Sequence, residues 1–163
     1  MESLKLKIKV FPKDRKVLKK KKKPFEEQTI VAETSNGILY YYHYIFKTVY
    51  GIELETTSFK AHVTINNGKE PLDIEKQKVI LNTINNKTLT VKYNTKPYIL
   101  WKFVALEVES EELINIRQQL NLSDDFKFHI TIGKIKDKCL PITNQLIERK
   151  QLNVNLTNIK IKR

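Results

Sequence analysis

The chain has 163 residues, of which 40% are hydrophobic, so it holds enough material for one globular domain (1–163) with a real core. No apolar stretch approaches the ~20 residues of a membrane-spanning helix, and the first residues lack the apolar segment of a signal peptide. The single cysteine, Cys139, excludes an internal disulfide and leaves no Cys/His cluster for zinc. We therefore expect a cytoplasmic protein that does not enter membranes.

The first part of the chain alternates strand and helix patterns. Residues 4–10 alternate apolar residues with lysine, which is typical of an amphipathic strand. Residues 13–24 include five consecutive lysines and predict a mobile loop; a localisation signal or a nucleic-acid contact is the alternative. A short strand is expected at 29–32, and apolar residues at helical spacing predict a helix at 38–49.

The predicted helix at 38–49 is rich in tyrosine and contains one of three histidines, His43. Tyr42 and its neighbours either form an aromatic wall that stacks on a base or bury one stripe against a sheet. The only tryptophan, Trp101, lies in a predicted strand and is a second candidate for base stacking. His43 lacks a threonine two residues later, so we interpret it as a packing or surface residue.

The remaining pattern predicts strands and helices in alternation. Residues 74–81 have mixed periodicity, and Ser110 is a good N-cap for a helix. Strands are expected at 59–65, 89–93, 100–108, 126–135 and 154–161, and helices at 111–120 and 141–149. This arrangement indicates an α+β fold of two lobes, each an antiparallel sheet with outer helices.

Two heptapeptides are almost the same: residues 59–65 read FKAHVTI, and residues 126–132 read FKFHITI. Both alternate, and alternate residues of a strand point to the same side of a sheet. One face of each strand is therefore apolar. The other faces carry Lys60, His62 and Thr64 in the first copy, and Lys127, His129 and Thr131 in the second. If the two strands lie side by side, the histidines and threonines converge on one site.

This set of side chains suits the cleavage of a phosphodiester. A neutral imidazole can take a proton from an attacking hydroxyl, while a protonated one gives a proton to the leaving oxygen. Threonine hydroxyls can donate hydrogen bonds to the non-bridging phosphate oxygens. No metal or other cofactor is required. A single His-x-Thr in a strand usually has only a structural role; the matched pair favours chemistry. Lys60 and Lys127 either contact the substrate or form a solvated rim.

The tetrapeptides HVTI (62–65) and HITI (129–132) resemble the paired His-x-Thr-x signatures of the 2H phosphoesterase superfamily. The resemblance covers about residues 38–135 and implies two pseudo-symmetric lobes around a central cleft. It further implies that His62 and His129 are the acid–base pair and that Thr64 and Thr131 bind phosphate. Superfamily members act on 2′,3′-cyclic phosphates, 2′,5′-oligoadenylates or cyclic oligonucleotides. They include small phage proteins that destroy cyclic-nucleotide immune signals.

The formal net charge of +12, from 30 basic and 18 acidic residues, favours a polyanionic partner. With the resemblance, this predicts a metal-independent phosphodiesterase that cleaves a cyclic di- or trinucleotide or 2′,5′-oligoadenylate and so blunts antiviral immunity. It would act in the host cytosol if the chain is viral. The alternatives are an RNA 2′,3′-cyclic phosphodiesterase and a module that binds RNA or a nucleotide without cutting it. His62, Thr64, His129 and Thr131 are the predicted catalytic residues, and Lys60, Lys127, Trp101 and Tyr42 the predicted substrate contacts.

Overall fold

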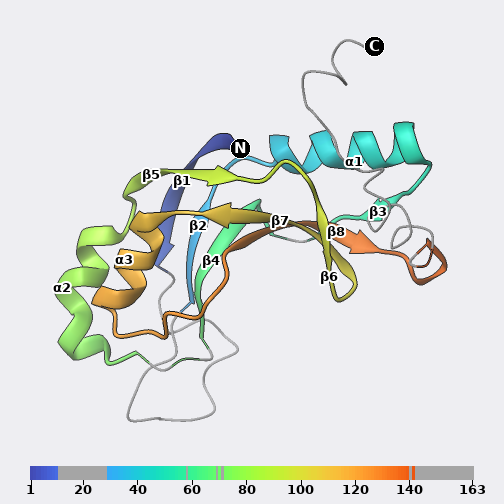
Figure 1. Ribbon diagram of the computed structural model, residues 1–163. Helices are drawn as coiled ribbons and strands as arrows, with labels where there is room; N and C mark the ends of the chain where they lie inside the picture. The colour runs from blue at the N-terminus through green and yellow to red at the C-terminus, as the bar shows by residue number, and fades with distance from the viewer. Residues whose placement is uncertain (11–28, 58, 69, 71, 140, 142–163) are drawn as a thin grey trace.

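A computed structural model describes residues 1–10, 29–57, 59–68, 70, 72–139 and 141 (Figure 1). Two expectations fall outside these ranges: the lysine-rich loop at 13–24, and the C-terminal helix and strand beyond residue 141. The strands are β1 (Glu2–Val10), β2 (Thr29–Glu33), β3 (Leu54–Glu55), β4 (His62–Asn67), β5 (Thr88–Tyr93), β6 (Tyr98–Leu100), β7 (Phe103–Glu109) and β8 (His129–Ile135). The helices are α1 (Gly37–Tyr50), α2 (Ile74–Ile84) and α3 (Glu111–Gln119), followed by a short 3₁₀ turn (Asp137–Cys139).

The strands form one antiparallel sheet that closes on itself. Following the hydrogen-bonded neighbours gives the order β1, β2, β4, β8, β7, β5 and back to β1, which is a closed six-stranded barrel. The short strands β3 and β6 extend the sheet beside β8 and β7. The predicted α+β class with an antiparallel sheet is confirmed. The strand pairing is continuous, so it does not divide the molecule into two separate sheets.

One face of the sheet is apolar and packs with the helices into a single core. Helix α1 contacts β8 and β3, α2 contacts β1, and α3 contacts β4. Alternate strand residues point into this core, among them Ile8, Ala32, Val63, Leu106 and Ile130, each with no exposed surface. At about 25 cal/mol per Å² of buried apolar surface, this core is the main force that holds the strands in register. None of the described helices is long and apolar enough to cross a membrane.

Most of the elements predicted within the described residues occur, with two corrections and one helix that the pattern left open. The predicted strand at 100–108 occurs as β7 but begins at Phe103, because the chain turns at Trp101, whose φ is 58°, to form a hairpin with β6. Residues 74–81 belong to α2, which begins where the Asp73 side chain accepts a hydrogen bond from Lys76 N. The motif strands begin at the histidines, not three residues earlier, and Phe59 is 65% exposed rather than packed in the core.

Helix α1 lies close to the second motif strand. The His43 ring bonds to the backbone carbonyl of Ile132, with Nε2 2.8 Å from the oxygen. A Cβ on Gly133 would lie 2.8 Å from that same Nε2 and 3.0 Å from the carbonyl oxygen of Glu55. Glycine therefore lets α1 and β3 approach β8 here. The interpretation of His43 as a packing residue agrees with this contact.

Candidate active site

The two His-x-Thr segments lie on neighbouring strands. Val63 of β4 is paired with Ile130 of β8 in an antiparallel register. One step along each strand, His62 then lies opposite Thr131, and Thr64 lies opposite His129. Residues opposite one another share a sheet face, with Cβ atoms about 4.5–5.5 Å apart. Val63 and Ile130 are buried in the core, so these four half-buried side chains share the opposite face.

The neighbouring strands extend this arrangement with two-fold symmetry about the Val63–Ile130 pair. On β2, Glu33 is the cross-strand partner of His62. On β7, Glu107 is the cross-strand partner of His129. Each histidine is therefore flanked by a threonine on one side and a glutamate on the other. Neither glutamate belongs to a sequence motif, because each is brought to its histidine by long-range strand pairing.

Each imidazole is fixed by the backbone two residues earlier in the chain. His62 Nδ1 lies 2.7 Å from the carbonyl oxygen of Lys60. A carbonyl oxygen can only accept, so Nδ1 carries the proton and Nε2 is the nitrogen available to a ligand. The His129 ring makes the equivalent bond to the backbone of Lys127. The lysines of the heptapeptides thus act on the site through their backbones, while both side chains are exposed.

The pKa of His129 is lowered from its ordinary value of 6.5. Burial is the main cause, because desolvation disfavours the charged ring. The bond to Lys127 opposes this shift, and the charge of His62 adds to it. The two imidazoles are therefore close enough to repel when both are charged, which favours a pair that carries a single proton.

The two predicted aromatic contacts lie away from this row. Tyr42 is completely buried, and its hydroxyl donates to the backbone carbonyl of Thr95 at 2.8 Å. It is a core residue, and the prediction that it contacts substrate is wrong. Trp101 is 74% exposed at the tip of the β6–β7 hairpin, with Lys102 Nζ 5.4 Å from its ring centroid. The ring of Phe59 lies close to a site histidine, with 6.2 Å between its centroid and that of His62.

Arg117 of α3 holds the two motif strands together from the buried side. Its guanidinium donates to the carbonyl oxygens of Ile65 and Ser123 and to the carboxylate of Glu70, at 2.5, 2.8 and 2.6 Å. It also lies 4.2 Å above the ring of Phe126. Ile65 follows Thr64 in β4, and the segment from Ser123 to Phe126 leads into β8. Arg117 therefore ties together the chain segments that carry the two copies of the motif.

Two lysines of β1 lie on the same face of the sheet as the histidines, two strands away from β4. On β1, Lys7 is the cross-strand partner of Glu33, and Lys9 is the partner of Val31, which in turn lies opposite Thr64. With strands about 4.8 Å apart, these lysine backbones are roughly 10 Å from the motif strand. Within the described part of the chain, no three His, Cys, Asp or Glu side chains are grouped so that they could hold a metal ion.

Comparison of the chain with known proteins finds no matching family model, no matching curated protein and no matching solved structure.

Proposed function

We propose that this protein is a 2H-type phosphodiesterase in which His62 and His129 are the acid–base pair. The observation that carries the proposal is the register of β4 against β8, which sets each histidine opposite the threonine of the other motif. Two imidazoles and two hydroxyls on one face can contact a single phosphate from two sides. The two-fold relation between these strands also agrees with the pseudo-symmetric halves that the resemblance implies.

The lowered pKa of His129 supports His129 as the base and His62 as the acid. A neutral His129 accepts the proton of the attacking hydroxyl through Nε2 while that oxygen forms its bond to phosphorus. The protonated His62 donates the proton on its Nε2 to the leaving oxygen as the phosphorus–oxygen bond breaks. The hydroxyls of Thr64 and Thr131 donate to the non-bridging oxygens, where charge lies in the transition state. The two histidines supply both proton transfers, so the mechanism needs no metal.

The proposed substrate is a small oligonucleotide signal: a cyclic di- or trinucleotide of an antiviral pathway, or 2′,5′-oligoadenylate. The net charge of +12 and the row of Lys7 and Lys9 suit a ligand with more than one phosphate. Its cleavage would blunt antiviral immunity, and the protein would act in the cytosol. The competing candidate is an RNA that ends in a 2′,3′-cyclic phosphate.

The test is cleavage of a matched panel in the presence of EDTA. The panel holds 3′,3′-cyclic dinucleotides, cyclic trinucleotides, 2′,5′-oligoadenylate and an RNA with a 2′,3′-cyclic phosphate end. We expect turnover of a signal nucleotide that chelation leaves unchanged and that the double variant His62→Ala/His129→Ala abolishes. Cleavage of the RNA end alone would replace the signalling function with RNA processing. If every member binds and none is cut, the protein is a binding module.

The pH dependence of kcat/KM follows from the proton assignment. A base must be neutral to work, so the acid limb of the profile should report His129 and lie below pH 6.5, because the pKa of this ring is lowered. The other proton transfer needs a charged imidazole as the acid, so activity should fall again at high pH, giving a bell-shaped curve. Activity that rises steadily with pH and never falls would contradict a protonated histidine as the acid.

A further inference from the structure

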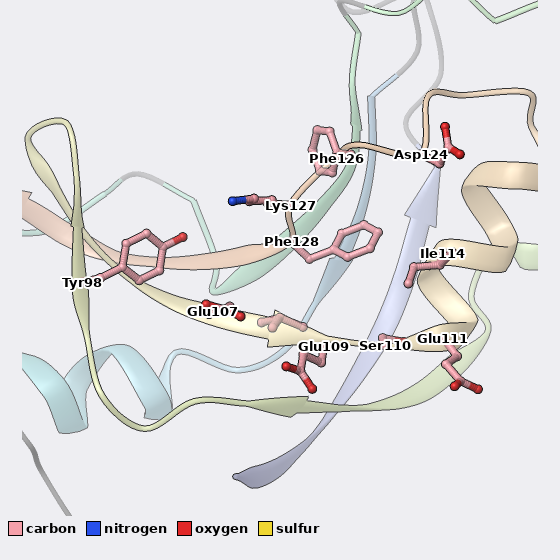
Figure 2. A pocket seen from close by; sticks show the side chains of 11 residues that line it. Tyr98, Glu107, Glu109, Ser110, Glu111, Ile114, Asp124, Phe126, Lys127 and Phe128 are labelled. Carbon is pink, nitrogen blue, oxygen red and sulfur yellow. The ribbon is translucent and has the colours of Figure 1, made fainter.

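A pocket of about 660 Å³ is lined in part by the two residues that precede His129 in the chain, Lys127 and Phe128 (Figure 2). One wall comes from β6 and β7, another from the start of α3, and the third from the segment that leads into β8. Its lining also includes Glu107, the cross-strand partner of His129. A ligand bound to the histidines could therefore extend into this pocket.

The lining combines aromatic rings with carboxylates. Three rings contribute, those of Tyr98, Phe126 and Phe128, and the rings of the two phenylalanines lie 5.5 Å apart. Four acidic residues also line the pocket: Glu107, Glu109, Glu111 and Asp124. One lysine, Lys127, also lines the pocket, so the formal charge of the lining is −3, the reverse of the whole chain's. This charge disfavours a second phosphate, because like charges repel. The pocket thus suits a flat, uncharged group that offers hydrogen-bond donors.

Glu107 is the acidic residue of this lining that is the cross-strand partner of His129, and it lies close to the ring of Tyr98. The pKa of the Tyr98 hydroxyl is raised, first by burial and then by the charge of Glu107, so this carboxylate lies close to the ring. Figure 2 shows the two side chains on the same side of the pocket. Glu109 lies further along β7, with Lys92 of β5 as its cross-strand partner, which offsets its charge. Glu107 is thus the acceptor best placed for a group attached to the reacting nucleotide.

We propose that this pocket binds the base of the nucleotide whose phosphate lies between the histidines, and that it prefers guanine. Guanine presents two adjacent donors, N1–H and the N2 amino group, which match the two oxygens of one carboxylate. Such a charged, bidentate pair is both strong and directional. Adenine, cytosine and uracil each offer a single donor group on that edge, and the aromatic rings can stack on any base. This inference rests on the proposed function, because the phosphate position comes from the histidine pair. Of the substrates proposed above, it favours a cyclic nucleotide that contains guanine over 2′,5′-oligoadenylate.

The test separates base binding from cleavage. The 5′-monophosphates of guanosine, adenosine, cytidine and uridine are titrated into the protein while the ring resonances of Tyr98, Phe126 and Phe128 are followed by NMR. Cleavage of the 3′,3′-cyclic dinucleotides of the four bases, and of the four nucleoside 2′,3′-cyclic phosphates, is measured in parallel. We expect guanine to be bound roughly 10- to 100-fold more tightly than the other bases, the usual size of discrimination by one good bidentate pair.

The variant Glu107→Gln should remove this preference by weakening guanine binding alone. Glu112→Gln is the matched control, because Glu112 also belongs to α3 but does not line the pocket, and it pairs with Lys87 at 3.7 Å. Equal affinity for all four bases, or a guanine preference that survives Glu107→Gln, would overturn the inference. If guanosine monophosphate binds as expected and no diester is cleaved, the base pocket stands and the phosphodiesterase proposal fails. If diesters are cleaved without any base preference, the phosphodiesterase proposal stands and the base pocket fails.

Discussion

Replacing either His62 or His129 by alanine is expected to lower kcat by roughly 10²–10⁴-fold, the usual contribution of a general acid or base. The two imidazoles act on one phosphate in the same step, so the double variant should lose little more than the worse single variant. Steady-state kinetics on the substrate cleaved by the wild-type protein measure all three losses. A multiplicative loss in the double variant would mean that the histidines act independently.

Variants of Thr64, Thr131 and His43 are the comparison for the loss of kcat expected in the His62 and His129 variants. Thr64→Val and Thr131→Val each remove one hydroxyl from the phosphate and should cost less than a histidine, because the proton transfers remain. His43→Ala removes a ring that bonds the backbone carbonyl of Ile132, which is a packing contact, so kcat should be retained in the folded protein. A large loss of kcat for His43→Ala with no loss for His129→Ala would mean that His43, and not His129, takes part in the proton transfers.

Replacing Arg117 by methionine is expected to lower the free energy of unfolding by about 2–4 kcal/mol. The guanidinium is almost completely buried, and its removal leaves the carbonyl oxygens of Ile65 and Ser123 without their charged donor. Methionine keeps the apolar volume, so the loss isolates the hydrogen bonds. Since single domains are stable by only about 5–15 kcal/mol, this is a large fraction of the total. Urea unfolding measures it.

Glu70 is the matched control for the ion pair. Its carboxylate side chain is 36% exposed, so Glu70→Gln should cost less than about 1 kcal/mol. Its pKa is lowered, first by the hydrogen bond from Ser123 and also by Arg117, so its stabilisation is present above pH 4.5 and is lost as the pH falls below that value. If Arg117→Met lowers the free energy of unfolding by no more than Glu70→Gln does, then Arg117 is not what holds the two motif strands together.

Local patterns were enough to place most elements. Alternation of lysine and apolar residues predicts β1, and the Ser110 cap predicts the start of α3, where the serine oxygen accepts from Leu113 N at 3.2 Å. The hairpin at Trp101 was not predictable in this way, because a left-handed turn residue is usually glycine or asparagine. The burial of Tyr42 was also not predictable from local sequence. Helical spacing indicates that one side of α1 is buried, but it does not identify which side.

Local sequence predicts some residues of the candidate site and misses others. His62, Thr64, His129 and Thr131 could be found because strand parity puts each pair on one face. Glu33, Glu107 and Arg117 could not, since their contacts join residues that are far apart in the chain. Barrel closure brings β4 beside β8, and closure depends on the sum of all strand pairings rather than on any single segment.

The most direct test of the central claim is an NMR titration of the wild-type protein with inorganic phosphate. The chain has three histidines, so each ring Cε1–H resonance can be followed separately. If both motifs form one phosphate site, the resonances of His62 and His129 should shift together, with one Kd and a stoichiometry of one, while that of His43 stays in place. Separate affinities for His62 and His129, or a shift of only one of them, would contradict the shared site.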